Sequence, residues 1–230
     1  MKRPREIRAA PKEWIPLLRV AYSFLRRQGI GDLLLYGSQA MSVYMKNPMR
    51  SKDLDLLSSQ VSLRQMETLA DKLSEINEVQ YKTTTAQTRK FNDRKMTTYA
   101  IELRVSGKPF FVEVFDRILD GRPLSILQPY VVPTKRWTID FWSPTREAIV
   151  ALRLAFRQPE GITRLNAMRL NSLIQENRRS LDFEQVAKIV KDWGIENWVE
   201  NNLTQLYRRN RIRILNDRKI VPGVERRIKV

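Results

Sequence analysis

The sequence of 230 residues contains no cysteine and no histidine. Without cysteine, disulfide bonds and thiolate metal sites are excluded. Without histidine, zinc hydrolysis by imidazole ligands and histidine-based acid–base catalysis are excluded as well. The chemistry that remains for a catalytic site is that of carboxylates with hard divalent cations, Mg²⁺ or Mn²⁺.

Long hydrophobic runs are also missing. No apolar stretch approaches the length that a membrane span requires, and the first five residues lead into charged sequence without the apolar core of a signal peptide. We therefore expect a cytoplasmic protein with no membrane partner. Glycine is scarce, with 8 residues, and arginine is common among the basic residues, a combination that points to a thermophilic source.

Negative charge is in short supply. The 42 basic residues outnumber the 25 acidic ones and give a net charge of +17, which favours a polyanion as partner. Nine of the basic residues fall within residues 207–230, either as a solvated tail or as a nucleic-acid contact. With 42% hydrophobic and 9% aromatic residues, the chain can form one large or two small folded domains.

An apolar run at residues 33–36 ends in Gly37 and Ser38. This pattern predicts a buried strand that turns directly into a helix over residues 39–45. Glycine lets the backbone come close to a bound group, and the unpaired N–H groups of a helix N-terminus attract anions. Gly37 and Ser38 are therefore candidate phosphate ligands.

Two aspartates lie on the next predicted strand, residues 53–57. Asp53 and Asp55 are two residues apart, so their carboxylates point to one face while the leucines between and after them point to the other. Two carboxylates so close repel each other unless a cation lies between them. Arg50 and Lys52 flank the pair and either hold phosphate or balance the local charge.

A third acid is expected on a strand over residues 110–115, which a turn at residues 106–109 joins to a strand over residues 96–105. Glu113 lies between two valines there, and an acid in a buried strand is costly unless it is paired or bound to metal. Glu113 is the first candidate and Asp116, at the strand end, the alternate. The three acids would form a metal site.

The order Gly-Ser, Asp-x-Asp and a distant acid on a later strand resembles the polymerase-β-type nucleotidyltransferase superfamily. Within it, residues 37–41 and 50–56 look most like the AbiEii-type branch, which includes the toxins of type IV toxin–antitoxin systems. The resemblance is close over residues 31–116 and looser to residues 148–154. Arg153 stands where that branch usually has a lysine, and a further Lys-Asp-x-x-Asp-type signature is replaced by residues 161–166.

This resemblance implies two Mg²⁺ ions held by Asp53, Asp55 and Glu113, an NTP as donor, and RNA as acceptor, including the 3′ end of a tRNA. It also implies an antitoxin protein as partner, and it places Arg153 on the triphosphate. The alternative for Arg153 is a purely structural role at a domain interface. Two rival functions stay open: transfer to a protein or a small molecule such as an aminoglycoside, and non-catalytic nucleic-acid binding on the same scaffold.

The expected fold class is α+β. A small mixed sheet flanked by helices forms a catalytic domain, residues 1–142, and a basic all-helical domain follows, residues 143–230. In the first domain we expect helices over residues 12–28 and 61–76 and a strand over residues 79–84. The polar, basic residues 86–95 form either a hairpin loop or an arm over the site. The second domain begins with Ser143 as N-cap and Pro144 as the first helical residue.

Overall fold

A computed structural model of the chain describes residues 8–91, 93–156, 162–221 and 224. The chain divides into two compact units. The sheet unit comprises Met1–Val43 and Asn47–Ser143, and the helical unit comprises Tyr44–Lys46 and Pro144–Val230. The division into a catalytic domain, residues 1–142, and a basic helical domain, residues 143–230, remains a prediction.

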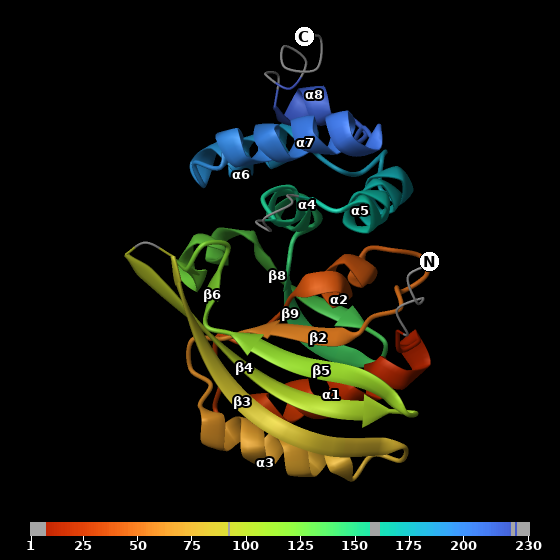
Figure 1. The fold of residues 1–230 in the computed structure, drawn as a ribbon, viewed down its shortest axis with the longest axis vertical. Helices are drawn as coiled ribbons and strands as arrows, with labels where there is room; N and C mark the ends of the chain where they lie inside the picture. The colour runs from red at the N-terminus through yellow and green to blue at the C-terminus, as the bar shows by residue number, and fades with distance from the viewer. Residues whose placement is uncertain (1–7, 92, 157–161, 222–223, 225–230) are drawn as a thin grey trace. The chain divides into compact units, whose positions relative to one another are not determined.

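The sheet unit is built on a five-stranded mixed sheet (Figure 1). In spatial order its strands are β1 (Leu34–Leu35), β2 (Asp53–Leu57), β5 (Lys108–Phe115), β4 (Arg94–Val105) and β3 (Val79–Phe91). β2 and β5 run parallel, and every other neighbouring pair is antiparallel. The combination of this mixed sheet with helices confirms the expected α+β class.

Helices α1 (Pro11–Arg27) and α3 (Leu63–Ser74) cover one face of the sheet (Figure 1). α3 packs against β3 and β4, and α1 packs against α3. The alternation along β5 follows from this one-sided cover, because Phe110, Val112 and Val114 are buried while Phe111 and Glu113 are only half-buried. The opposite face of the sheet is therefore the one available to a ligand.

The β3–β4 hairpin differs from the expectation. Residues 86–91 and 94–95, predicted as loop or arm, continue the two strands in unbroken register up to the pair Phe91 and Arg94. Threonine, which favours strands because of its branched side chain, recurs through both strands and stabilises this long ribbon despite its polarity. The turn at Ser106 and Gly107 between β4 and β5 is as predicted, with both residues at positive φ.

Two further helix boundaries differ from the expectation. α2 (Gly37–Val43) begins at Gly37 itself, two residues earlier than predicted. The prediction of Ser143 as an N-cap is wrong, because the strand β9 (Ile139–Pro144) runs on through it and its hydroxyl lies 2.9 Å from that of Thr134. Thr145 caps the following helix instead, accepting from the N–H of Ala148 at 3.3 Å.

The remaining short elements of the sheet unit follow β5. They are β6 (Arg117–Ile118), β7 (Arg122–Pro123), the 3₁₀ helices η1 (Leu124–Ile126) and η2 (Gln128–Tyr130), and β8 (Val131–Arg136). β6 pairs with β7, and β8 pairs with β9. β6 and β7 therefore form a small hairpin directly after Asp116.

The helical unit contains α4 (Arg146–Leu154), α5 (Arg164–Glu176), α6 (Phe183–Asp192), α7 (Glu196–Asn210) and α8 (Asp217–Ile220). α4 contacts α5, α6 and α7. Of the predicted C-terminal basic cluster, Arg226, Arg227 and Lys229 lie outside the described residues, as does Gly161. Over the ranges that the structure describes, no helix has the length and apolar character that crossing a membrane demands.

Phe110 and Phe111 are adjacent in β5 but point to opposite faces, and this gives a test of the layering. Phe110 is fully buried against the helix side. Phe110→Ala should lower the free energy of unfolding by about 3–5 kcal/mol, as expected for an aromatic residue deleted from a core. Phe111→Ala should cost less than half as much in the same urea titration, and equal losses would contradict the assignment of faces.

Candidate active site

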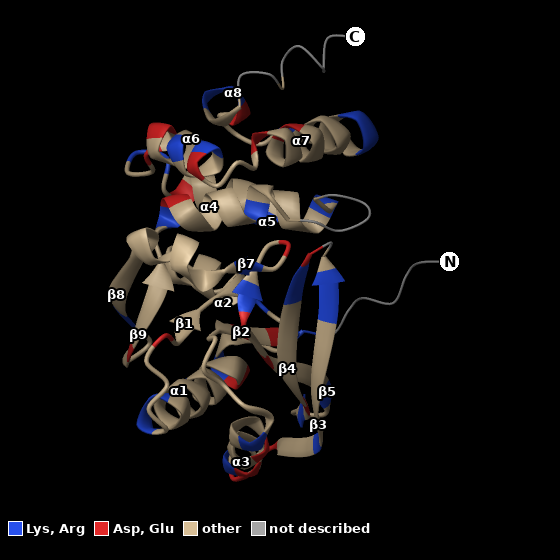
Figure 2. Ribbon diagram, turned by 90° about the vertical axis from the view of Figure 1, so that its left-hand side faces the viewer, with Lys and Arg blue, Asp and Glu red and all other residues tan. Residues whose placement is uncertain are grey.

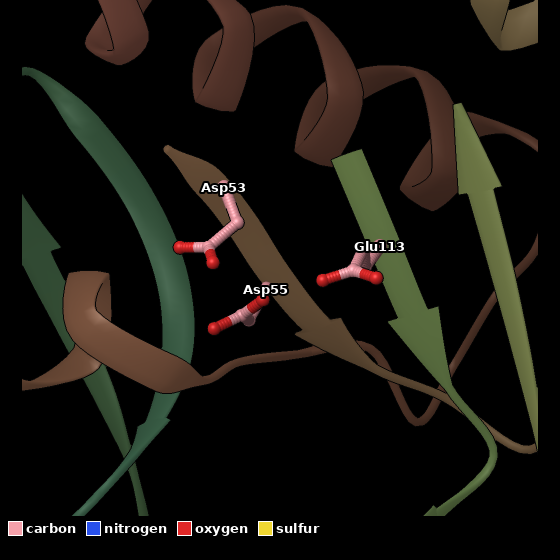
Figure 3. A group of neighbouring side chains, drawn as sticks. All are labelled: Asp53, Asp55 and Glu113. Atoms are coloured by element: carbon pink, nitrogen blue, oxygen red, sulfur yellow. The ribbon is translucent and has the colours of Figure 1, made fainter. Parts of the chain in front are cut away.

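The parallel pairing of β2 with β5 brings the three predicted acids together. Asp55 lies directly opposite Glu113 in the register, and Asp53 lies opposite Phe111. One ligand oxygen from each of the three carboxylates lies within 4.8 Å of the others. Figure 3 shows Asp53 and Asp55 on β2 and Glu113 on β5, with the carboxyl groups on the same side of the sheet.

Asp55 is seated against Gly37. A Cβ atom built on Gly37 would lie 1.8 Å from Oδ2 of Asp55 and 2.5 Å from its Cγ, so any larger residue would displace the carboxylate. The φ of Gly37 is +64°, a conformation that also favours glycine. The backbone N–H of Tyr36 donates to the Asp55 carbonyl at 2.9 Å and fixes the strand at this point. The sequence pattern identified this glycine, but as a phosphate contact and not as the seat of an aspartate.

Asp53 is held by hydroxyl and amide groups from α2 and from the segment before β2. Ser51 Oγ donates to Asp53 Oδ1 at 2.7 Å and lies 2.8 Å from the hydroxyl of Ser38. The side-chain amide of Gln39 donates to the backbone carbonyl of Asp53. Ser51 is itself fixed by a backbone bridge to Ala9. Sequence reasoning missed Ser51 and Gln39, although the two-residue spacing from Ser51 to Asp53 puts both on one strand face.

Glu113 has a perturbed acidity. Burial raises the pKa of Glu113 above its ordinary value, and the negative charge of Asp53 raises it further. The positive charges of Lys52 and Arg89 act in the opposite direction without cancelling the effect. Ionisation of the Glu113 carboxylate is thus unfavourable, and a cation between it and the two aspartates would reduce this electrostatic cost.

The alternate third acid has another role in the structure. Asp116 Oδ1 accepts from the backbone N–H of Thr97 at 2.7 Å, and the Asp116 N–H donates to the Thr97 carbonyl at 3.1 Å. Asp116 therefore ties the end of β5 to β4. Among the described residues, it lies outside the group formed by Asp53, Asp55 and Glu113.

The predicted phosphate ligands lie in different places. Lys52 is next to the acids, since its charge acts on Glu113 and its carbonyl accepts from the N–H of Phe111 at 3.0 Å. Ser38 is 7% exposed, and its hydroxyl is engaged with Ser51. Arg50 is exposed on the segment before β2. Phosphate binding by Gly37, Ser38, Arg50 and Lys52 remains a prediction.

Arg153 belongs to the helical unit. Its guanidinium group lies over the ring of Phe156, 6.0 Å from the ring centroid. This contact between a cation and an aromatic ring lies within the helical unit. The assignment of Arg153 to the triphosphate stays a prediction.

The three acids fit a hard divalent cation. They offer only oxygen ligands, they are half-buried, and they converge from two neighbouring strands whose register is fixed. The close packing against Gly37 holds the Asp55 carboxylate in place, and the hydrogen bond from Ser51 holds that of Asp53. Such outer contacts orient metal ligands in known metal sites.

A pocket opens beside Glu113 on the same face of the sheet. It has a volume of about 240 Å³. It is lined by residues of β5, β4 and β3, which are Phe111, Glu113, Phe115, Thr98, Ala100, Glu102, Thr83, Thr85, Gln87 and Arg89. One of the three acids therefore faces a space that could hold a substrate.

Comparisons with known proteins bear on the fold. No family model matches the sequence, and a search of curated proteins finds no match. Among solved structures, the antibiotic-resistance factor ANT(2'')-Ia matches with a TM-score of 0.51 and 10% identity, over 80% of this chain and 92% of that one. The chain has a nucleotidyltransferase fold.

Two other solved structures resemble the chain. A candidate nucleotidyltransferase from H. pylori has 12% identity and a TM-score of 0.48, with 94% of each chain covered. An antigenic nucleotidyltransferase-like protein from Paracoccidioides brasiliensis has 14% identity and a TM-score of 0.48, with 97% of this chain and 95% of that chain covered.

Two glycine variants test whether the space left by Gly37 positions the Asp55 carboxylate. Gly37→Ala should displace the Asp55 carboxylate and weaken Mn²⁺ binding by at least about 10-fold, since even losing an outer contact of a metal ligand costs that much. Gly107→Ala is the matched control, because its φ of +75° imposes the same kind of strain while nothing lies within 4 Å of the new Cβ. Equal Mn²⁺ affinities in the two variants would show that the close packing of Asp55 against Gly37 does not position the metal ligand.

The raised pKa of Glu113 predicts a pH-dependent stability in metal-free protein. Because the folded pKa lies above the unfolded one, the folded state binds more protons, and stability falls as pH rises from the unfolded to the folded pKa. Glu113→Gln, which stays neutral, should therefore be more stable than the wild type at pH 8 in chelator. The difference should vanish well below the ordinary value of 4.5.

Thermal unfolding of both proteins across this pH range measures the effect. Glu67→Gln, at an exposed site on α3, is the control for removing a carboxylate from the same unit. A Glu113→Gln protein less stable than the wild type at pH 8 would show that the ionised carboxylate is well paired in the absence of metal.

Proposed function

We propose that the chain is a metal-dependent nucleotidyltransferase that moves a nucleoside monophosphate from an NTP to a hydroxyl group of RNA. The observation that carries the proposal is the convergence of Asp53, Asp55 and Glu113 on one face of a nucleotidyltransferase fold. The transfer forms a bond between the acceptor oxygen and the α-phosphorus of the NTP. The bond from that phosphorus to the bridging oxygen breaks, pyrophosphate leaves, and the acceptor proton passes to solvent.

The three carboxylates would hold Mg²⁺ or Mn²⁺. When bound, the cations would neutralise charge on the triphosphate and favour deprotonation of the attacking hydroxyl. Ser51 positions Asp53 by its hydrogen bond, and Gly37 leaves the space that Asp55 occupies. Lys52 supplies a fixed positive charge beside Glu113, where it would offset negative charge on the reacting phosphate.

The net charge of +17 supports RNA as the acceptor, since a polyanion gains most from such a field. From the resemblance to the AbiEii-type branch we also propose the 3′ end of a tRNA as acceptor and an antitoxin protein as partner. A protein side chain or a small molecule is the alternative acceptor, but neither of these acceptors accounts for the net charge of +17.

The test is transfer of label from each α-labelled NTP in turn to total cellular RNA, with Mg²⁺ present. The wild type should label RNA. Asp53→Asn and Glu113→Gln should each reduce the rate by more than about 100-fold, because losing a ligand costs at least as much as losing an outer contact. Asp116→Asn, which removes an acid outside the group, is the matched control and should retain most activity.

Other outcomes select the rivals. Label in protein would move the acceptor to a polypeptide, and label in neither, with RNA bound equally by wild type and Asp53→Asn, would support non-catalytic RNA binding. Loss of transfer in Asp116→Asn with transfer kept in Glu113→Gln would reverse the choice of third acid.

A further inference from the structure

β3 lies at one end of the five-stranded sheet and is paired along one edge only (Figure 1). β4 pairs with its inner edge, in unbroken register from Thr83 to Phe91. The strand is 13 residues long, and Val79 is its only buried residue. Strands in globular proteins are usually about half this length. β3 therefore presents a long outer edge to solvent.

The direction of the backbone groups of β3 follows from those of Thr97 in β4. Asp116, which follows β5, accepts from the Thr97 N–H at 2.7 Å and donates its own N–H to the Thr97 carbonyl at 3.1 Å. Both backbone groups of Thr97 therefore point away from β3. Thr97 and its partner Thr88 thus form a non-hydrogen-bonded pair, whose backbone groups point away from each other. The N–H and C=O of Thr88 lie on the open edge of the sheet.

Alternate residues of the strand share this orientation. Because the register is continuous over residues 83–91, four residues direct their N–H and C=O groups to the open edge, which are Thr84, Ala86, Thr88 and Lys90. Within the described part of the chain, no residue hydrogen-bonds to these groups from that side. Such a row of backbone groups is a template to which another extended chain can pair.

The central part of this edge lacks the features that usually protect an exposed strand. Proteins block such edges with charged residues, proline or a bulge. Residues 83–88, which read Thr-Thr-Thr-Ala-Gln-Thr, contain no charged residue and no proline. The one irregularity in the pairing of β3 with β4 lies earlier, between Tyr81 and Thr83. The stretch is therefore suited to pairing, and its threonines favour the extended backbone that pairing requires.

Positive charge marks one end of the open edge. Arg89 and Lys90 are consecutive and exposed, so strand alternation places one on each face of the sheet beside the edge. Lys95 lies directly opposite Lys90, where like charges repel. Figure 2 shows Lys and Arg residues, in blue, at this end of the β3–β4 hairpin. None of these three cations has an ion pair or hydrogen bond with a described residue.

These charges favour one kind of occupant. A second copy of the chain would bring its own net charge of +17 to the edge, and a large net charge keeps proteins apart. A strand with acidic residues beside Arg89 and Lys90 would instead be stabilised, because opposite charges on neighbouring strands attract. The occupant that fits is an extended acidic segment of another protein.

We propose that the open edge of β3 binds an extended acidic segment of a partner protein by strand addition. The segment pairs in the antiparallel sense, which is the more stable one. Its uncharged, β-branched part lies along residues 83–88. Its acidic residues are near its N-terminal end, which the antiparallel direction places beside Arg89 and Lys90. This surface goes beyond the proposed function, which makes no use of the β3 edge.

Amide hydrogen exchange of the full chain, followed residue by residue by NMR, tests the edge in the wild-type protein. The probe is a capped peptide with a pair of N-terminal glutamates followed by alternating valine and threonine. It should slow the exchange of the outward amides by at least about 10-fold, because they gain hydrogen bonds. The amides of Thr85 and Gln87, which already pair with β4, should change much less.

A pair of variants tests the same edge by affinity. Ala86→Pro/Thr88→Pro removes two outward N–H donors and leaves the donors of the β3–β4 ladder in place. Ala86→Val/Thr88→Val is the matched control, because it changes the same side chains and keeps both N–H groups. In calorimetric titrations, the proline variant should bind the peptide at least about 10-fold more weakly than the control, as expected for two lost hydrogen bonds. The exchange pattern of the wild type decides the question even where the proline variant does not fold.

Charge variants test the acidic character of the segment. Arg89→Gln/Lys90→Gln should weaken peptide binding about 3-fold or more, the effect expected of two exposed ion pairs. Lys12→Gln/Arg27→Gln, which removes two exposed cations of α1, is the matched control and should bind like the wild type. A peptide with lysines in place of its glutamates should bind the wild type more weakly.

Four results would overturn the inference. They are failure of the wild type to bind the acidic peptide, slowed exchange without alternation along β3, equal affinities of the proline and valine variants, and equal or tighter binding of the lysine peptide. Alternating protection that appears without peptide and grows with protein concentration would also overturn it, because the edge would then belong to a second copy of the chain.

Discussion

The candidate site depends on one constraint, the parallel register between β2 and β5. That register sets Asp55 opposite Glu113 and keeps Asp53 on the same face, so three carboxylates meet within 4.8 Å. A slip of one residue would turn the acids of one strand to the helix-covered face and separate them. The buried leucines of β2 and the buried phenylalanine and valines of β5 hold the register, because they fill the core beneath it. Apolar packing on one face of the sheet thus determines the positions of the carboxylates on the other face.

The mutual repulsion of the acids has to be opposed by the structure around them. Gly37 gives Asp55 its place, Ser51 donates to Asp53, and Lys52 and Arg89 lower the cost of ionising Glu113. These groups come from three parts of the chain, which are α2, the segment before β2, and β3, and the site lies where the three meet. The pocket along β5, β4 and β3 leaves an approach to one of the acids, Glu113.

Much of this arrangement could be predicted from local pattern. Alternation along the strand put Asp53 and Asp55 on one face of β2, and the cost of burying an acid between two valines made Glu113 the candidate third acid. The long β3–β4 ribbon could not be predicted in this way, because residues 86–95 are polar and basic, and only cross-strand pairing with threonine neighbours makes them extended. The spacing of Ser51 from Asp53 is compatible with a contact, but the bridge to Ala9 that fixes Ser51 in place is a tertiary contact that the sequence does not show. Ser143 has the sequence signature of a helix cap, but in the fold it belongs to β9 and contacts Thr134 of β8. Local sequence therefore located the three acids, and tertiary contacts determine what holds them in place.

The most direct measurement is the number of Mn²⁺ ions bound per chain, counted by electron paramagnetic resonance with a non-hydrolysable NTP analogue present. The account predicts two ions for the wild type, as expected for a two-metal site. It predicts loss of both when Asp53, Asp55 and Glu113 are replaced by their amides, in a protein that still unfolds cooperatively. Mn²⁺ binding that survives the loss of all three acids would contradict the account.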